Sequence, residues 1–271
     1  MMNSYLTVIL LAIIQGVTEF LPVSSSGHLA LFSTFFGLQT DTGLGLGIIL
    51  HAGSLLAIVC FYFKTLLGFF KKEQFHLLLM VIVGSIPAGI VGVILKKSGL
   101  ADYIFNDMLS VAMGFLITAS ILRLTGKSKM TSNANTELKE ISLRQAIIVG
   151  FAQMWAIVPG ISRSGSTIAA GILSGIKFES AAAFSFLLAL PAIAGASLLE
   201  IIELARNGFQ LGDFTIGHLA LGLVVSAAVS LASLYLLVQI LRKGKLAWFS
   251  WYLFLLGVSL MIWQILSLSR G

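Results

Sequence analysis

The stretch QGVTEFLPVSSSGHLALF, residues 15–32, places a Gln, a Glu, three consecutive serines and a His inside an apolar part of the chain. Around it the sequence is strongly hydrophobic: 58% of the 271 residues are hydrophobic, 10% are charged, and the mean hydropathy is +1.00. Soluble globular domains carry about 25% charged residues. The composition therefore predicts an integral membrane protein, in which so many polar groups need a polar partner.

Long apolar segments predict six membrane-spanning helices, because a helix of about 20 residues crosses about 30 Å of hydrocarbon. These segments are 44–63, 76–95, 107–125, 180–202, 216–241 and 246–268. Two further apolar segments, 4–36 and 145–176, are interrupted by LPVSSSGH and VPGISRSG. We expect each to form a re-entrant hairpin of two half-helices. The predicted fold is an all-α membrane protein forming a single domain, 1–271.

The distribution of basic residues predicts the orientation of these helices. If every long segment spans and both broken ones turn back, twelve Lys and Arg residues lie on one side and four on the other. The first set is Lys64, Lys71, Lys72, Arg123, Lys127, Lys129, Lys139, Arg144, Lys177, Arg242, Lys243 and Lys245; the second is Lys96, Lys97, Arg206 and Arg270. Cytoplasmic loops are enriched in Lys and Arg. The richer side is therefore predicted to face the cytoplasm.

The two broken segments resemble each other and enter from opposite sides, which predicts an inverted repeat with halves at about 1–125 and 140–271. Four residues recur at a constant offset of 138 positions. They are Gln15, Ser24, Ser26 and Gly27, which match Gln153, Ser162, Ser164 and Gly165. Pro22 and Pro159 are out of register by one residue. The alternative is a chance similarity between two breaks rich in Ser and Gly.

The breaks are expected to form an anion site. Irregular backbone at membrane depth is tolerated only where it is buried in protein or lines a polar cavity. A helix that begins at a Ser/Gly turn directs unpaired N–H groups, and the positive end of its dipole, at that cavity. Arg163 lies in the second break, and an intramembrane Arg indicates a negative partner such as phosphate. The alternative is a structural, snorkelling Arg.

Other ionisable residues are divided between this site and ordinary packing. Glu19 follows Gln15 by one helical turn, and His28 lies near the start of the next half-helix, so we expect both to join Arg163. His51, His76 and His218 lack acidic neighbours at ligand spacing and are interpreted as helix-end or packing residues. Cys60 lies in an apolar run and is interpreted as a small core residue.

These motifs resemble the BacA/UppP family of undecaprenyl-diphosphate phosphatases, the bacitracin resistance proteins. The likeness runs nearly end to end, through QGVTEFLPVSSSGH (15–28), HAGSLLAIV (51–59), PGISRSGST (159–167) and FSFLLALPAIAGA (184–196). It implies hydrolysis of undecaprenyl diphosphate to the lipid carrier of cell-wall synthesis, and tolerance to bacitracin. The family pattern has Glu or Gln, three residues, then Glu; here it reads Gln15 and Glu19. One carboxylate that some members have is absent, which weakens a metal site built on a Glu pair.

The resemblance favours Ser25 as the nucleophile. Ser25 and His28 are three residues apart at a helix start, which places both on one face, so His28 is expected to take the serine proton. Glu19 is expected to orient His28 or, with Gln15, to hold a divalent cation, and Arg163 to stabilise the transferring phosphoryl group. The predicted substrate-binding residues are Ser24, Ser26, Gly27, Ser162, Ser164, Gly165 and Ser166.

The main alternative is a transporter or flippase of an anionic prenyl lipid, because many carriers are inverted repeats with broken helices. Ser25 beside a base favours an enzyme, since a carrier needs no nucleophile. Nucleic-acid binding is not expected, because the basic residues lie in short loops between apolar segments. Family grounds imply a homodimer in the bacterial inner membrane, with the site open to the outer face. They also imply dependence on Mg²⁺ or Ca²⁺ and no organic cofactor.

The charge asymmetry predicts that positions 40 and 210 face outward and that the loop 126–144 is cytoplasmic. In intact cells, and in a chain whose own Cys60 has been replaced, an impermeant thiol reagent is expected to modify a cysteine at position 40. It is expected to spare one at position 133 until the membrane is opened. Labelling of position 133 from outside would reverse the orientation.

Overall fold

The computed structural model describes residues 4–35, 43–69, 71, 74–100, 107–127, 134–207 and 214–268, so positions 40, 133 and 210 lie outside the described residues. Within them the regular structure is helical, apart from an isolated bridge between Thr136 and Ile176. The helices are α1 (Ser4–Thr18), α2 (Ser25–Phe35), α3 (Gly43–Phe61), α4 (Phe63–Gly68), α5 (Phe75–Ser98), α7 (Met108–Lys127), η4 (Leu138–Glu140), α8 (Leu143–Trp155), α9 (Arg163–Leu173), α10 (Phe178–Asn207), α11 (Ile216–Arg242), η5 (Leu246–Trp248) and α12 (Phe249–Leu268).

Five of the six predicted spans form helices long and apolar enough to cross a membrane: α5, α7, α10, α11 and the η5–α12 segment. The sixth span, predicted over 44–63, forms a helix whose described apolar part is shorter than those five. It forms α3, which ends at Phe61, and Tyr62 separates it from α4. The chain is therefore an all-helical, multi-pass membrane protein, as the composition predicts.

Both interrupted segments form a pair of helices joined by an irregular break. Residues 19–24 separate α1 from α2, and residues 156–162 separate α8 from α9. Helix α8 begins with a capping box between Ser142 and Gln145, and α9 begins at the N-cap Ser162, whose Oγ accepts a bond from the Gly165 N–H. The positions of the breaks predicted from Pro, Ser and Gly are thus confirmed.

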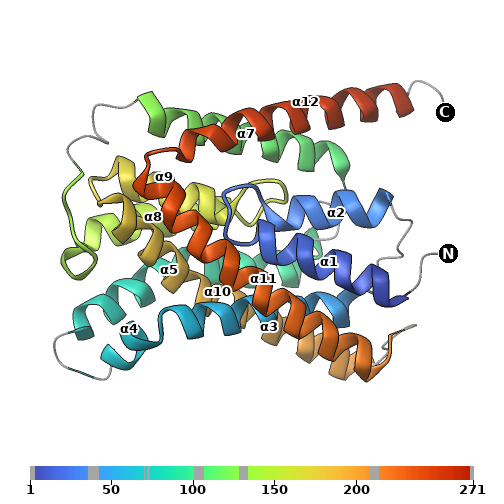
Figure 1. The fold of residues 1–271 in the computed structure, drawn as a ribbon, viewed down its shortest axis with the longest axis horizontal. Helices are drawn as coiled ribbons and strands as arrows, with labels where there is room; N and C mark the ends of the chain where they lie inside the picture. The colour runs from blue at the N-terminus through green and yellow to red at the C-terminus, as the bar shows by residue number, and fades with distance from the viewer. Residues whose placement is uncertain are drawn as a thin grey trace.

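The long helices surround the two breaks (Figure 1). Helix α1 packs against α11, which also packs along α3; α8 packs against α5. Helices α7 and α12 run side by side as a separate pair, and α7 contacts both α2 and α9. The breaks therefore lie in the interior of the bundle, where other helices can satisfy their backbone groups.

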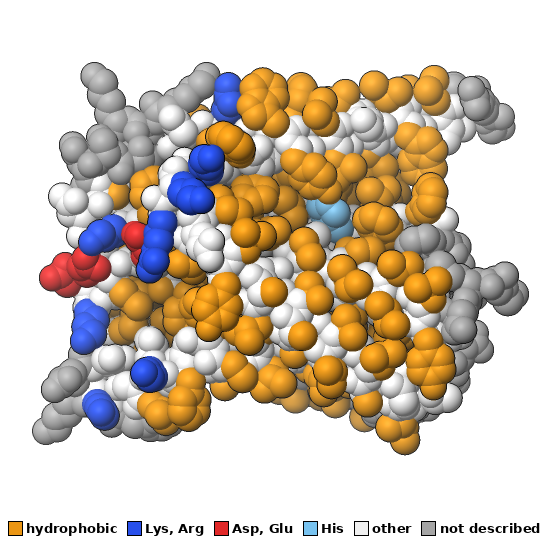
Figure 2. Space-filling model, viewed as in Figure 1, with side chains coloured by type: hydrophobic (Ala, Val, Ile, Leu, Met, Phe, Trp, Pro, Cys, Tyr) orange, Lys and Arg blue, Asp and Glu red, His pale blue; other side chains and the backbone are white. Residues whose placement is uncertain are grey.

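Basic side chains gather at one end of the molecule, where α7 and α11 end and α12 begins (Figures 1 and 2). In the middle of the same face most of the coloured side chains are hydrophobic. Exposed apolar residues of α11 and α12 include Tyr235, Leu236, Phe254 and Leu255. A wide apolar belt with a basic end is the surface expected of a protein surrounded by lipid.

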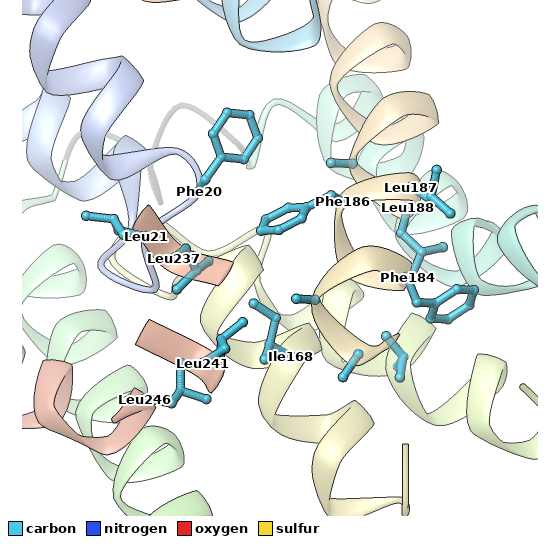
Figure 3. Packing of buried hydrophobic residues seen from close by; sticks show 14 of the residues in the cluster. Phe20, Leu21, Ile168, Phe184, Phe186, Leu187, Leu188, Leu237, Leu241 and Leu246 are labelled. Carbon is cyan, nitrogen blue, oxygen red and sulfur yellow. The ribbon is translucent and has the colours of Figure 1, made fainter. Parts of the chain in front are cut away.

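The first break is anchored in the hydrophobic core by Phe20, whose side chain is fully buried (Figure 3). Its ring meets the ring of Phe186 on α10 edge to face, with the ring centroids 5.4 Å apart. Leu21 from the same break and Ile168 from α9 belong to the same buried cluster. Aromatic pairs of this kind contribute about 0.5–1.5 kcal/mol beyond their buried area. The break is thus held in one place although its backbone is irregular.

The second break rests on α7 at Gly114. A Cβ atom built there would lie 2.4 Å from the Pro159 carbonyl oxygen and 2.7 Å from the Gly160 Cα. One turn further along α7, the Thr118 hydroxyl accepts a hydrogen bond from the Ser162 N–H at 2.9 Å. Thr118 Oγ1 also lies 3.2 Å from the Gly160 carbonyl oxygen. This close approach satisfies backbone groups of the break that would otherwise be unpaired.

Replacing Gly114 with Ala is therefore expected to destabilise the fold by about 1–3 kcal/mol, the usual cost of overpacking. The control is Gly89→Ala in α5, where a Cβ would have no heavy atom within 4 Å. There the better helix propensity of Ala, worth about 1 kcal/mol, has no opposing clash. Thermal unfolding in detergent compares the two variants. Equal midpoints would show that α7 does not press on the break.

Candidate active site

The two breaks lie against each other. The Ser164 hydroxyl, in the first turn of α9, donates a hydrogen bond to the Leu21 carbonyl in the first break at 3.1 Å. A Cβ on Gly165 would lie 3.3 Å from the Pro22 Cβ, and one on Gly27 would lie 3.1 Å from the Gly160 Cα. Only small residues permit this approach. The starts of α2 and α9 thus meet inside the bundle, as the sequence predicts.

Glu19 is the residue at which both breaks converge. Its carboxylate is nearly inaccessible to solvent and is bound by three side chains. Arg163 Nη2 lies 2.7 Å from Glu19 Oε1, the Ser25 hydroxyl donates to Oε2 at 2.5 Å, and Gln15 Nε2 donates to Oε2 at 3.1 Å. A buried carboxylate is stable only when it is paired and hydrogen-bonded in this way.

Ser24 has a strained backbone that sets the direction of Ser25. Its φ is +70°, a left-handed conformation that costs a non-glycine residue about 1–3 kcal/mol. The strain is offset by local hydrogen bonds: Ser24 Oγ accepts from the Gly27 N–H at 3.4 Å, and its carbonyl oxygen lies 2.8 Å from His28 Nδ1. Ser26 Oγ lies 3.3 Å from Ser24 Oγ. The sharp turn brings Ser25 back toward Glu19.

The predicted contact between Ser25 and His28 is replaced by other pairings. Among the described residues, Ser25 Oγ bonds to Glu19, whereas His28 bonds through Nδ1 to Ser24 and through Nε2 to the Tyr252 hydroxyl at 2.7 Å. The His28 ring also meets the Phe115 ring edge to face. Ser25 and His28 are three residues apart and are therefore neighbours on α2. The turn at residues 19–24, however, places the Glu19 carboxylate beside Ser25, and the hydroxyl donates to that carboxylate instead of to His28.

The hydrogen-bond donors at the start of α9 fall into two groups, those with a protein partner and those without one. Ser162 Oγ caps α9 and lies 3.2 Å from Ser164 Oγ, so these two hydroxyls already have partners. In contrast, Arg163 Nη1 and Ser166 Oγ are buried and have no hydrogen-bond partner among the described residues, and the same is true of Gln15 Oε1. Buried polar atoms without a protein partner are rare in folded proteins, so these three are candidates for contact with a bound ligand. Arg163 and Ser166 therefore keep free donors inside the protein.

His51 belongs to the site, and its interpretation as a packing residue was wrong. Its Nδ1 lies 3.0 Å from Gln15 Nε2 and 3.9 Å from Glu19 Oε2. The sequence showed no acidic neighbour because Glu19 is separated from it by a turn and a whole helix. His76 and His218 do act as structural residues: His76 Nε2 bonds to the Ile141 carbonyl, and His218 forms a capping box with Thr215 at the start of α11.

The donor set of the site suits a hard divalent cation in kind. Glu19 offers carboxylate oxygens and Gln15 an amide oxygen, both ligands of Mg²⁺ and Ca²⁺. In the described part of the chain no cluster of three or more His, Cys, Asp or Glu residues is present. Two protein oxygens fit a cation whose remaining ligands come from substrate phosphate and water, which is the usual arrangement for Mg²⁺.

Comparison with known proteins gives a consistent result. Residues 8–259 match the family model described as bacitracin resistance protein BacA. A protein named undecaprenyl-diphosphatase from Halothermothrix orenii is 40% identical over 257 residues, which cover 94% of this chain and 96% of that protein. A protein of the same name from Carboxydothermus hydrogenoformans is 36% identical over 263 residues, covering 97% and 98%. The chain therefore belongs to the BacA family of bacitracin resistance proteins.

Proposed function

We propose that this protein hydrolyses undecaprenyl diphosphate to undecaprenyl phosphate and inorganic phosphate. The observation that carries this is the contact of Glu19 with both Ser25 and Arg163 at the junction of two helix starts. A serine hydroxyl on a carboxylate, beside a guanidinium with a free donor, is a phosphoryl-transfer arrangement. The names of the relatives support the substrate. The product is the lipid carrier of cell-wall synthesis, and its recycling would confer tolerance to bacitracin.

Ser25 is the proposed nucleophile, with Glu19 as its base. Ser25 Oγ attacks the terminal phosphorus, its proton passes to Glu19 Oε2, and the bond to the bridging oxygen breaks. Undecaprenyl phosphate leaves and a phosphoseryl group remains. Water then attacks this group, the bond from phosphorus to Ser25 Oγ breaks, and Glu19 returns its proton to that oxygen as inorganic phosphate is released. The leaving group is a phosphate monoester, so it needs no strong general acid.

His28 is proposed to act in the second half of the reaction. Its Nε2 bonds to Tyr252, whose side chain is 48% exposed on α12, so this partner can be exchanged for water or substrate. A neutral imidazole can then accept a proton from the attacking water. This differs from the expectation that His28 activates the serine, because Glu19 is the residue in contact with Ser25.

Arg163 is proposed to bind the phosphate oxygens together with the start of α9. Its Nη1 is buried without a partner among the described residues, and Ser166 Oγ shares this property. N–H groups at the starts of α2 and α9 add positive potential at the same place. Ser24, Ser162 and Ser164 then shape the turns, since their hydroxyls already cap or bridge the breaks.

We also propose a divalent cation, Mg²⁺ or Ca²⁺, held by Glu19 and Gln15. Its charge would neutralise phosphate oxygens and make the phosphorus more electrophilic. Gln15 Oε1 supports this, because it is a buried acceptor without a partner among the described residues. The assignment of Ser25 as nucleophile rests on its hydrogen bond to Glu19 and not on the cation.

We infer that the two halves form an inverted repeat of re-entrant hairpins. The same bonds recur at the offset of 138 residues: Gly27 N–H to Ser24 Oγ in the first break, and Gly165 N–H to Ser162 Oγ in the second. The basic end of the molecule supports a cytoplasmic position for that end (Figure 2). The site would then receive substrate from the outer face of the bacterial inner membrane.

Purified protein in detergent is expected to release inorganic phosphate from undecaprenyl diphosphate, whereas a flippase would release none.

Arg163→Lys keeps the positive charge but loses the planar fork, so we expect kcat to fall by at least about 10²-fold, the scale for losing one transition-state donor. The rate of phosphate release at varied substrate concentration gives kcat and KM for the wild type and the variant. Near-normal turnover of Arg163→Lys would make Arg163 a structural residue or a source of charge only.

Ser25→Ala is expected to reduce turnover to near background while leaving KM largely unchanged, because a nucleophile acts on the chemical step. Ser24→Ala and Ser26→Ala, which alter the turn but not the nucleophile, are matched controls and should only slow turnover. Mass spectrometry of wild-type protein quenched during turnover is expected to find the phosphoryl group on Ser25. Robust hydrolysis by Ser25→Ala, without any phosphoenzyme in the wild type, would instead mean direct attack by water.

A further inference from the structure

His51 lies at the more exposed end of a chain of polar side chains that reaches the Glu19 carboxylate. It projects from the middle of α3, which packs against α1, α10 and α11. Its ring is one-third exposed, and its only ring nitrogen with a described hydrogen-bond partner, Nδ1, lies 3.0 Å from Gln15 Nε2. Gln15 in turn donates to Glu19. The mechanism above does not use His51.

The amide of Gln15 can satisfy its neighbours in only one orientation. Its Nε2 lies 3.1 Å from Glu19 Oε2, so the opposite orientation would place two acceptor oxygens in contact. An amide nitrogen has only hydrogens to offer. His51 Nδ1 must therefore accept the second N–H, with the ring proton on Nε2. Ser54 Oγ is a poorer alternative, because it is 3.4 Å from Gln15 Nε2 and lies 3.0 Å from Ser230 Oγ.

This orientation determines two features of the site at once. It directs one N–H to the same carboxylate oxygen that accepts the Ser25 hydroxyl, and it leaves Gln15 Oε1 without a hydrogen-bond partner among the described residues. A carboxylate at position 15 would have no hydrogen to give to His51 Nδ1. Gln15 and His51 are thus complementary, because His51 Nδ1 accepts the hydrogen that the Gln15 amide donates.

We propose that His51 is a positioning residue for hydrolysis, which acts through Gln15 to hold Glu19 against Ser25. The inference rests on the proposed function. Without the acceptor at His51, the Gln15 amide is free to rotate, and Glu19 Oε2 loses the donor that fixes it beside Ser25. The expected effect is on the chemical step, because these contacts position Glu19, the proposed base for Ser25.

A double-mutant cycle tests the proposal through phosphate release from undecaprenyl diphosphate. His51→Ala is expected to lower kcat by about 10-fold, the scale for residues that orient a functional group, with little change in KM. His51→Gln supplies an amide oxygen as the acceptor and should restore most of the turnover. In a Gln15→Met background, His51→Ala should cost nothing further, because the residue through which it acts is gone.

His218→Ala is the matched control, because His218 is a buried histidine that caps α11 outside the site. It should lower the unfolding midpoint in detergent and leave kcat unchanged. His51→Ala should instead lower kcat and leave the unfolding midpoint unchanged. Losses that multiply in the double variant, or a His51→Gln protein as slow as His51→Ala, would overturn the proposal. A wild-type protein that releases no phosphate would overturn the proposed function, and the role of His51 with it.

Discussion

The ion pair between Glu19 and Arg163 is the interaction on which the centre of this protein depends. The carboxylate of Glu19, in the first break, lies 2.7 Å from the guanidinium of Arg163, the residue that begins α9 directly after the second break. Removing one partner of such a pair typically costs about 3–5 kcal/mol, because the other charge is left buried. The pair therefore ties two segments that are 144 residues apart in the sequence. Among the described residues, no other ion pair joins the two breaks.

The surrounding packing follows from the requirement that irregular backbone be satisfied without water. Thr118 accepts from the Ser162 N–H, and Ser164 donates to the Leu21 carbonyl. Glycines at 27, 114 and 165 allow the backbones to approach closely enough for these bonds. The same features that make the breaks tolerable inside a membrane protein also aim the starts of α2 and α9 at one point.

The site combines this rigidity with local strain and free donors. Ser24 remains in a left-handed conformation because its side chain and carbonyl are both hydrogen-bonded. Electrostatic interactions are stronger in apolar surroundings than in water, which is why the proposed phosphate site needs only one guanidinium and two helix starts. The donors that remain unpaired among the described residues, Arg163 Nη1 and Ser166 Oγ, lie on the α9 side of the junction. In Arg163, Nη2 thus pairs with Glu19, while Nη1 is the atom proposed to bind phosphate.

The sequence by itself determined the fold class, the positions of both breaks and five long membrane helices. These follow from local composition, since apolar length and Ser/Gly/Pro interruptions act within short segments. The tertiary structure decided which side chains touch. Helical spacing paired Ser25 with His28, but the turn at residues 19–24 is not helical and returns Glu19 to Ser25. His51 joined the site only because α3 packs beside α1, and the spacing of residues along a chain contains no information about which helices become neighbours.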